Sequence, residues 1–206
     1  MPNLDFILID RSGSMRDSWS RVLAAVNSYP TSLQRNFTRS HLVCAAFANN
    51  WGLDYTVLRD IPNIAWKPLR TDEISPGGDT PLNDAIVYTC ELITDRLGCF
   101  EAPDAVSVVV AIISDGGENA SEHDLDFTHA LMARKRALGW QFVFLGLDFN
   151  AEQIARDYGC PVESALNTDI RRLGDSLKRI AEKRKSPGTP LLFDGRDKKD
   201  LGGAVP

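Results

Sequence analysis

The sequence predicts an α/β fold: a doubly wound, mostly parallel sheet with one antiparallel edge strand and helices on both faces. Continuous apolar runs of strand length, such as residues 4–10 and 105–114, are typical of strands that are buried on both faces. Segments in which apolar residues recur with helical spacing separate these runs. Strands that alternate with helices favour a parallel sheet covered on both sides.

The first half of the chain is expected to hold three strands and one helix. Residues 54–60 alternate between apolar and polar types and follow turn-forming residues at 49–52, so they are expected to form a hairpin with the preceding strand. In chain order, the elements are a strand at 4–10, a helix at 19–36 bent at Pro30, a strand at 41–47, an edge strand at 54–60 and irregular residues at 62–76.

The second half is expected to begin its helices at Thr80, at Ser121 and at Asn150 or Ala151. Thr80 suits the N-cap of its helix and Pro81 suits the first helical position. In chain order, the elements are a helix at 80–98, a strand at 105–114, a helix at 121–138, a strand at 140–147, a short helix at 150–159, a short strand at 161–166 and a closing helix at 168–185.

The composition changes after residue 185. Residues 186–206 are rich in glycine and proline, and their only apolar cluster is Leu191, Leu192 and Phe193. We therefore expect one domain over residues 1–185 and an extended tail over 186–206. Docking of the apolar cluster on the domain and docking on a partner are both compatible with the sequence.

Bulk properties restrict the location and the partners. The net charge of −5 argues against nucleic acid as a partner. The four cysteines include no C-x-x-C pair, which argues against a zinc site. The sequence has no run of about 18 apolar residues, and its N-terminus lacks the features of a signal peptide. We expect a cytoplasmic protein with reduced thiols and no membrane contact.

Five oxygen-bearing side chains follow predicted strands or begin a predicted helix: Asp10, Ser12, Ser14, Thr80 and Asp115. Asp10 ends the first strand and Asp115 ends the strand at 105–114. If these strands are neighbours at the point where the winding reverses, the two carboxylates face each other across a crevice. Carboxylate and hydroxyl oxygens are ligands for hard cations, so the set is expected to hold Mg²⁺, or else Mn²⁺ or Ca²⁺.

These residues also carry a family resemblance. The pattern Asp-x-Ser-x-Ser at residues 10–14 resembles the metal-ion-dependent adhesion site (MIDAS) of von Willebrand factor A (vWA) domains. The threonine of that site falls on Thr80 in GGDTPLNDAI, and its distal aspartate falls on Asp115 in ISDGGEN. The likeness extends over residues 4–185, and short, stand-alone intracellular vWA proteins of bacteria and phages look similar.

The resemblance implies a binding function. The metal would keep an open coordination position, which a Glu or Asp of a partner protein completes. Such a module would act as an adaptor, sometimes beside an ATPase, or within a larger assembly. Asp79 would contact the metal through water or favour the helix N-terminus, and Glu118 and Asn119 would touch a partner or remain solvated.

Other interpretations remain open for the same residues. Taken alone, Ser12-Gly13-Ser14 is also an ordinary turn and Thr80 a plain N-cap. A structural subunit, for instance of a viral particle, would use the tail as its contact. Enzymes of the haloacid dehalogenase type keep a nucleophilic aspartate where Asp10 lies, but they have a second aspartate where this chain has Ser12. No enzymatic activity is therefore expected, and the four tryptophans are expected in the core or at its rim.

Overall fold

The computed structural model describes residues 3–34, 40–99, 106–184 and 189–202. Its strands are β1 (Asn3–Asp10), β2 (Ser40–Asn49), β3 (Leu53–Pro62), β4 (Ser107–Ser114), β5 (Gln141–Leu147) and β6 (Ala165–Thr168). They form a six-stranded sheet in the order β3-β2-β1-β4-β5-β6. Neighbouring strands are parallel except β2 and β3, which form an antiparallel hairpin at one edge. The predicted fold class is confirmed.

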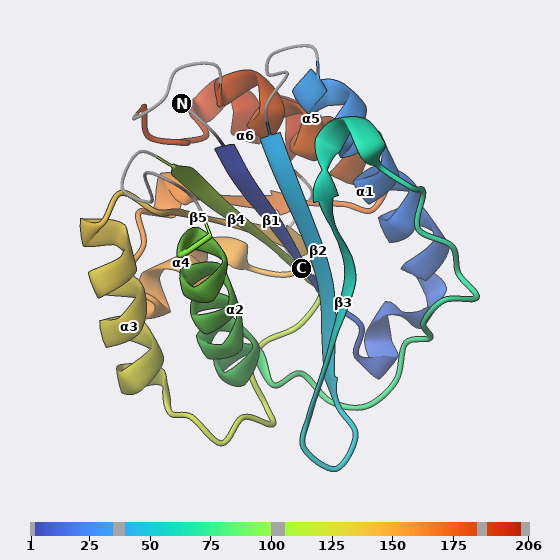
Figure 1. Cartoon of the computed structure of the whole chain (residues 1–206), viewed down its shortest axis with the longest axis vertical. Coiled ribbons are helices and arrows are strands. Elements are labelled where there is room, and N and C mark those ends of the chain that lie inside the picture. The colour runs from blue at the N-terminus through green and yellow to red at the C-terminus, as the bar shows by residue number, and fades with distance from the viewer. Residues whose placement is uncertain (1–2, 35–39, 100–105, 185–188, 203–206) are drawn as a thin grey trace.

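Helices cover both faces of this sheet (Figure 1). They are α1 (Trp19–Gln34), α2 (Leu82–Leu97), α3 (Leu125–Ala137), α4 (Ala151–Asp157), α5 (Leu173–Lys183) and α6 (Gly195–Leu201), with short 3-10 helices η1 (Gly13–Asp17), η2 (Asn63–Ala65) and η4 (Val162–Ser164). The apolar sides of α1, α5 and α6 form one core with the sheet, and those of α2, α3 and α4 form the other.

Strand β1 lies at the centre of both cores. All eight of its residues are buried. Ile7 and Ile9 point into the core beneath α1 and α5, whereas Phe6 and Leu8 point into the core beneath α2. The continuous apolar run in the sequence therefore reflects a strand with no solvent-facing side.

Two helix starts differ from the predictions. Pro81, not Thr80, is the N-cap of α2, because both backbone groups of Thr80 are bonded to Asn119. Asp124, not Ser121, caps α3 by accepting a hydrogen bond from the Phe127 N–H. The hydroxyl of Ser121 instead donates to Glu118 Oε2 over 2.6 Å. In both cases the residue predicted as the cap is bonded to a loop residue instead, Thr80 to Asn119 and Ser121 to Glu118.

The C-terminal segment is not extended over its described residues. Helix α6 begins after Asp194, whose carboxylate accepts hydrogen bonds from the N–H groups of Arg196 and Asp197. Leu191 and Phe193 are buried in the core beneath α1 and α5, and Gly202 pairs with Thr168 at the end of β6. The apolar cluster of the tail therefore docks on the domain itself.

Other predicted boundaries moved by a few residues. The last strand begins later than expected because Val162–Ser164 form η4 before β6. The closing helix α5 also begins later, at Leu173, since β6 continues to Thr168. The helix start at Asn150 is confirmed, since its side chain accepts from the Gln153 N–H. Predictions for residues 1–2, 35–36, 105, 185–188 and 203–206 lie outside the described residues. Among the described helices, none has the length and apolar character needed to cross a membrane.

A buried ion pair joins the two ends of the domain's chain. Arg184, just after α5, lies 2.7 Å from Asp5 Oδ1 on β1. The Tyr29 hydroxyl also donates to this oxygen over 3.0 Å, and Arg184 donates to the carbonyl oxygen of Ser107 over 2.7 Å. Burial raises the pKa of Asp5, and Arg184 and Tyr29 oppose this effect. The pair fixes α5 against β1 and β4.

We expect Asp5→Asn to lower the free energy of unfolding by about 3 kcal/mol, because the Arg184 charge would stay buried without its counterion. Urea unfolding followed by circular dichroism measures this loss. Asp72→Asn is the control, since it removes only an exposed ion pair with Arg70 and should leave the midpoint unchanged. Equal shifts in the two variants would contradict a stabilising role for the buried pair.

Candidate metal centre

The predicted site lies at the carboxyl edge of the sheet, between β1 and β4. Strand β1 pairs with β2 on one side and with β4 on the other, so the winding direction reverses at β1. Ligands of doubly wound sheets bind at such a reversal. Asp10 is the last residue of β1, and Asp115 directly follows β4. The predicted neighbourhood of these two strands is confirmed.

Asp10 is fixed by hydrogen bonds to both of its carboxylate oxygens. Its exposed fraction is 0 %. Oδ1 accepts from the Ser12 backbone N–H over 2.7 Å, and Oδ2 accepts from the Ser114 hydroxyl over 2.6 Å. Burial raises the pKa of Asp10, and the bonds from Ser114 and Ser12 oppose this effect. The carboxylate is therefore oriented by two neutral donors, the Ser114 hydroxyl on β4 and the Ser12 N–H in the turn after β1.

The two serine hydroxyls connect this turn to Asp115. The Ser12 and Ser14 Oγ atoms are 3.1 Å apart, and the Ser14 hydroxyl donates to Asp115 Oδ1 over 2.7 Å. Partial burial raises the pKa of Asp115, and the bond from Ser14 opposes this effect. Ser14 is exposed, whereas Ser12 is buried. The hydroxyls thus lead from the buried Asp10 outward to Asp115.

Thr80 is held next to both loops by main-chain hydrogen bonds. Its N–H donates to Asn119 Oδ1 over 2.8 Å, and its carbonyl oxygen accepts from the Asn119 N–H over 3.2 Å. On the other side, the Gly13 N–H donates to the Gly78 carbonyl oxygen over 2.9 Å. A Cβ built on Gly116, the residue after Asp115, would lie 3.9 Å from Thr80 Oγ1. The structure therefore brings all three predicted stretches together.

Gly78 is required where this loop meets the β2–β3 hairpin. Its φ angle is +81°, and a Cβ at this position would lie 2.0 Å from the Asn49 carbonyl oxygen. A side chain here would therefore push the loop that carries Thr80 away from the β2–β3 hairpin.

The donor chemistry of the predicted set fits a hard divalent cation. The set offers two carboxylates and three hydroxyls and has no nitrogen or sulfur donor. Within the described ranges, no three His, Cys, Asp or Glu side chains are grouped so that they could hold a metal. A site at Asp10 and Asp115 must therefore draw most of its protein ligands from hydroxyls.

Three residues support the site without having been predicted to do so. The Ser114 hydroxyl holds Asp10. Glu118 accepts a hydrogen bond from the N–H of Asn83 over 2.7 Å, and so it provides an acceptor for one of the N–H groups in the first turn of α2. Asn119 holds the backbone of Thr80. The sequence offered a signal only for Ser114, a hydroxyl residue at the end of a buried strand directly before Asp115.

Asp79 and His123 also lie near the site. The backbone of Asp79 pairs with Asn49, and its side chain is exposed. His123 lies at the surface as expected, and its Nδ1 is 2.7 Å from Asp84 Oδ1.

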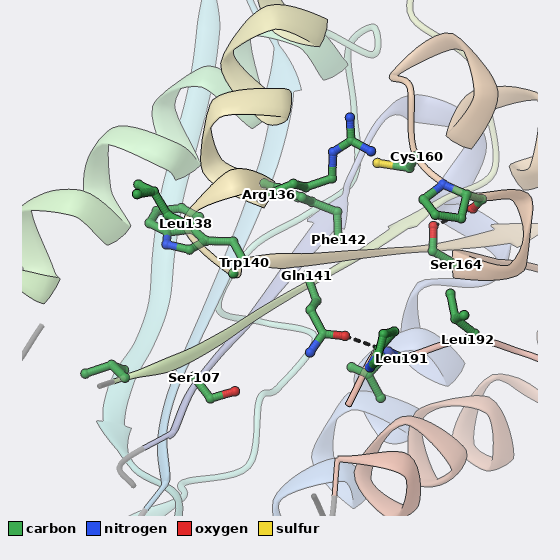
Figure 2. A pocket seen from close by; sticks show the side chains of 14 residues that line it. Ser107, Arg136, Leu138, Trp140, Gln141, Phe142, Cys160, Ser164, Leu191 and Leu192 are labelled. Carbon is green, nitrogen blue, oxygen red and sulfur yellow. Dashed lines mark hydrogen bonds between the residues drawn. The ribbon is translucent and has the colours of Figure 1, made fainter. Parts of the chain in front are cut away.

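A separate cavity of about 490 Å³ lies at the opposite edge of the sheet (Figure 2). Residues at the start of β4 and β5 line it together with Leu191 and Leu192. The Leu191 N–H donates to Gln141 Oε1 over 2.5 Å, which fixes the C-terminal segment along this cavity. Because it adjoins the amino ends of these strands, the cavity is unconnected with the predicted metal site.

Solved structures with the same architecture include domains of pilus proteins. The pilus adhesin SpaC from Lactobacillus rhamnosus GG, in its open conformation, aligns over 88% of this chain at 12% identity with a TM-score of 0.69. The vWF domain of the type V pili tip protein Mfa5 from Porphyromonas gingivalis aligns over 88% of this chain and 94% of its own, at 9% identity and a TM-score of 0.67. The fold is vWA-like.

A third vWA-like neighbour is proximal thread matrix protein 1 (PTMP1) from the mussel byssus. Its structure with a zinc-occupied MIDAS motif aligns over 87% of this chain at 17% identity with a TM-score of 0.59. The chain spans 30% of the length of SpaC and 46% of that of PTMP1. No protein-family model matches the sequence, and no curated protein matches it. The likeness therefore establishes the vWA-like fold.

Ser114→Ala tests whether the buried hydrogen bond to Asp10 orients a metal ligand. Loss of a group that holds a ligand weakens metal affinity by roughly 10- to 100-fold, and we expect this loss for Mg²⁺ and Mn²⁺ in calorimetric titrations. Ser32→Ala is the control, since the Ser32 hydroxyl donates to the Ser28 carbonyl oxygen within α1, and this variant should keep the wild-type affinity. Unchanged affinity in the Ser114 variant would show that this bond serves only the sheet.

Proposed function

We propose that this chain is a divalent-cation-dependent protein-interaction module. Asp10, Ser12, Ser14, Thr80 and Asp115 would hold the cation, and a Glu or Asp of a partner protein would complete its coordination. The observation that carries the proposal is the hydrogen bond of 2.7 Å between Ser14 and Asp115, which lie 101 positions apart in the chain. This contact gathers oxygen donors at the point where the sheet reverses its winding.

The balance of charges supports an incoming acid. Three of the five proposed ligands are neutral hydroxyls, and both oxygens of Asp10 already accept hydrogen bonds. A cation held largely by neutral oxygens keeps more of its charge for an external carboxylate. Such a bond has strict geometry, so it supplies specificity as well as affinity.

Mg²⁺ is the cation we propose first, with Mn²⁺ or Ca²⁺ as substitutes. Oxygen-only donor sets favour these hard ions over soft ones. The zinc-occupied MIDAS motif of PTMP1 belongs to a neighbour of this fold, so Zn²⁺ is a useful comparison in the titrations.

A non-enzymatic role agrees better with the burial of Asp10 than the phosphoryl-transfer alternative. In addition to this burial, Ser12 stands where such enzymes have a second aspartate, and a serine hydroxyl has no pKa suited to general acid catalysis. SpaC is a pilus adhesin, Mfa5 a pilus tip protein and PTMP1 a thread matrix protein.

Assembly through the C-terminal tail has less support than contact through the metal. Leu191 and Phe193, the apolar residues that could bind a partner, are buried in the domain's own core. Leu192 remains exposed by 39 % beside them. We therefore place the principal contact at the carboxyl edge of the sheet.

The proposed setting is a cytoplasm, with an ATPase or a larger assembly as the source of the partner acid. All four cysteines are free thiols, as is usual in reducing compartments. The resemblance to short vWA proteins of bacteria and phages is the reason for proposing this kind of partner. Nucleic acid and membranes are not proposed as partners, given the net charge of −5.

Thermal unfolding with added metal gives the direct test of the cation site. Mg²⁺ at about 100 times its dissociation constant should stabilise the wild type by about 2.7 kcal/mol and raise its Tm. Ser14→Ala and Asp115→Asn should lose this response, because each removes a proposed ligand. Asp72→Asn, an exposed acid in a separate loop, is the matched control and should keep it. An equal rise of Tm in all four proteins would show that Mg²⁺ does not bind at the proposed site.

A displayed library of random peptides tests the partner acid. Selection on the wild type in Mg²⁺ should enrich Glu or Asp at one position, and chelation by EDTA should abolish binding. Ser14→Ala should select no such acid. Peptides that bind equally well in Mg²⁺ and in EDTA would show that the interaction does not pass through a metal.

A further inference from the structure

Trp51 is the most exposed of the large hydrophobic side chains that the structure describes. It lies at the turn of the β2–β3 hairpin with an exposed fraction of 105 %. Tryptophan is highly buried on average in folded proteins, and burial of its large side chain contributes strongly to cores and interfaces. The expectation that Trp51 belongs to the core or its rim is wrong. Its full exposure means that packing against the described residues does not account for the choice of tryptophan here.

The turn itself does not require tryptophan either. Trp51 has a φ angle of +72°, a left-handed conformation that favours Gly, Asn or Asp. The turn is closed by its neighbours: the Asn50 N–H donates to the Gly52 carbonyl oxygen over 3.1 Å, and the Gly52 N–H donates to Asn49 Oδ1 over 3.2 Å. An aromatic side chain is thus retained at a position where both backbone preference and solvation disfavour it.

The hairpin is bonded to each of the three loops that form the candidate metal centre. The Asn49 N–H donates to the Asp79 carbonyl oxygen over 3.0 Å, directly before Thr80. The Asn49 side chain donates to the Ala120 carbonyl oxygen over 3.1 Å, in the loop after Asp115. Arg11, between the proposed ligands Asp10 and Ser12, forms an ion pair with Asp54 on β3.

These contacts place the hairpin turn that carries Trp51 at the same edge of the sheet as the candidate metal centre. Residue 47 of β2 pairs with Asp10, so the hairpin continues beyond the end of β1 at the carboxyl edge, where the candidate ligands lie. Figure 1 shows the hairpin turn reaching past the other strands at the lower end of the sheet. Because Trp51 lies two residues after Asn49, whose hydrogen bonds attach the hairpin to two of the loops, a protein bound at the proposed metal would meet the indole near the site.

We propose that Trp51 is a second contact for the protein that supplies the metal-bound acid. This inference rests on the proposed function and extends it to the chemistry of the partner. The partner segment carries one Glu or Asp for the cation and, at a fixed distance from it, an apolar surface that accepts the indole. Tryptophans that are exposed in the free protein and become buried in a complex are frequent hot spots of protein interfaces.

Peptide selection on Trp51→Ala separates this inference from the proposed function. The wild type should select an acid together with an apolar residue at constant spacing. Trp51→Ala should still select the acid and lose the apolar preference, and a peptide chosen on the wild type should bind it about 30-fold more weakly. Ile64→Ala, at an exposed apolar position by the opposite edge of the sheet, should select the wild-type pattern.

The outcomes are distinguishable. Selection of acids that depends on Mg²⁺ in both proteins, with equal peptide affinity, would overturn the role of Trp51 and leave the metal site intact. Loss of any acid preference in the wild type would overturn the proposed function itself. Sedimentation of the wild type as a dimer and of Trp51→Ala as a monomer would assign the tryptophan to self-association and overturn its role in partner binding.

Fluorescence supplies an independent measurement on the folded protein. Trp19 and Trp140 are buried and Trp66 is half-buried, so Trp51 should dominate quenching by iodide. Binding of the selected peptide in Mg²⁺ should protect the wild type from quenching and shift its emission to shorter wavelength. Binding without protection would contradict burial of the indole in the complex.

Discussion

The parallel pairing of β1 with β4 is the constraint on which the candidate site depends. It sets Asp10 beside Ser114, although the two residues are 104 positions apart, and their side chains form a hydrogen bond of 2.6 Å. The turn after β1 then meets the loop after β4 through Ser14 and Asp115. A slip of this register by one residue would turn Asp10 toward the opposite face and separate the donors.

Strand β1 carries a buried carboxylate near each end, and the two carboxylates have different bonding partners. Asp5 at the amino edge is neutralised by Arg184 and is part of the domain's structure. Asp10 at the carboxyl edge accepts bonds only from neutral groups among its described partners, Ser12 and Ser114. Neutral donors orient a carboxylate without cancelling its charge, so that edge keeps an attraction for a cation. The asymmetry separates a stabilising ion pair from a site suited to metal binding.

Much of the fold was predictable because strands that are buried on both faces of a sheet appear in the sequence as continuous apolar runs. The buried runs gave the strands, and Asp-x-Ser-x-Ser with Thr80 and Asp115 gave a site whose members the structure gathers together. Contacts between distant loops were not predictable from local signals. Asn119, from the loop after β4, binds both backbone groups of Thr80, and Pro81 takes the expected cap position of Thr80. Similarly, α6 and the burial of Phe193 follow from tertiary packing that a Gly- and Pro-rich composition conceals.

The proposed contact through Trp51 would give a shared fold a specific partner. The pilus protein Mfa5 and the byssus protein PTMP1 share the vWA-like fold with this chain at 9% and 17% identity, and a shared fold does not determine which ligand is bound. In the proposed complex, a metal-bound carboxylate would likewise be common to many partners and would distinguish few of them. Discrimination would then come from surfaces that are held beside the candidate metal centre. The β2–β3 hairpin meets this condition, because Asn49 and Arg11 attach it to the loops of the site while its turn stays free to contact another protein.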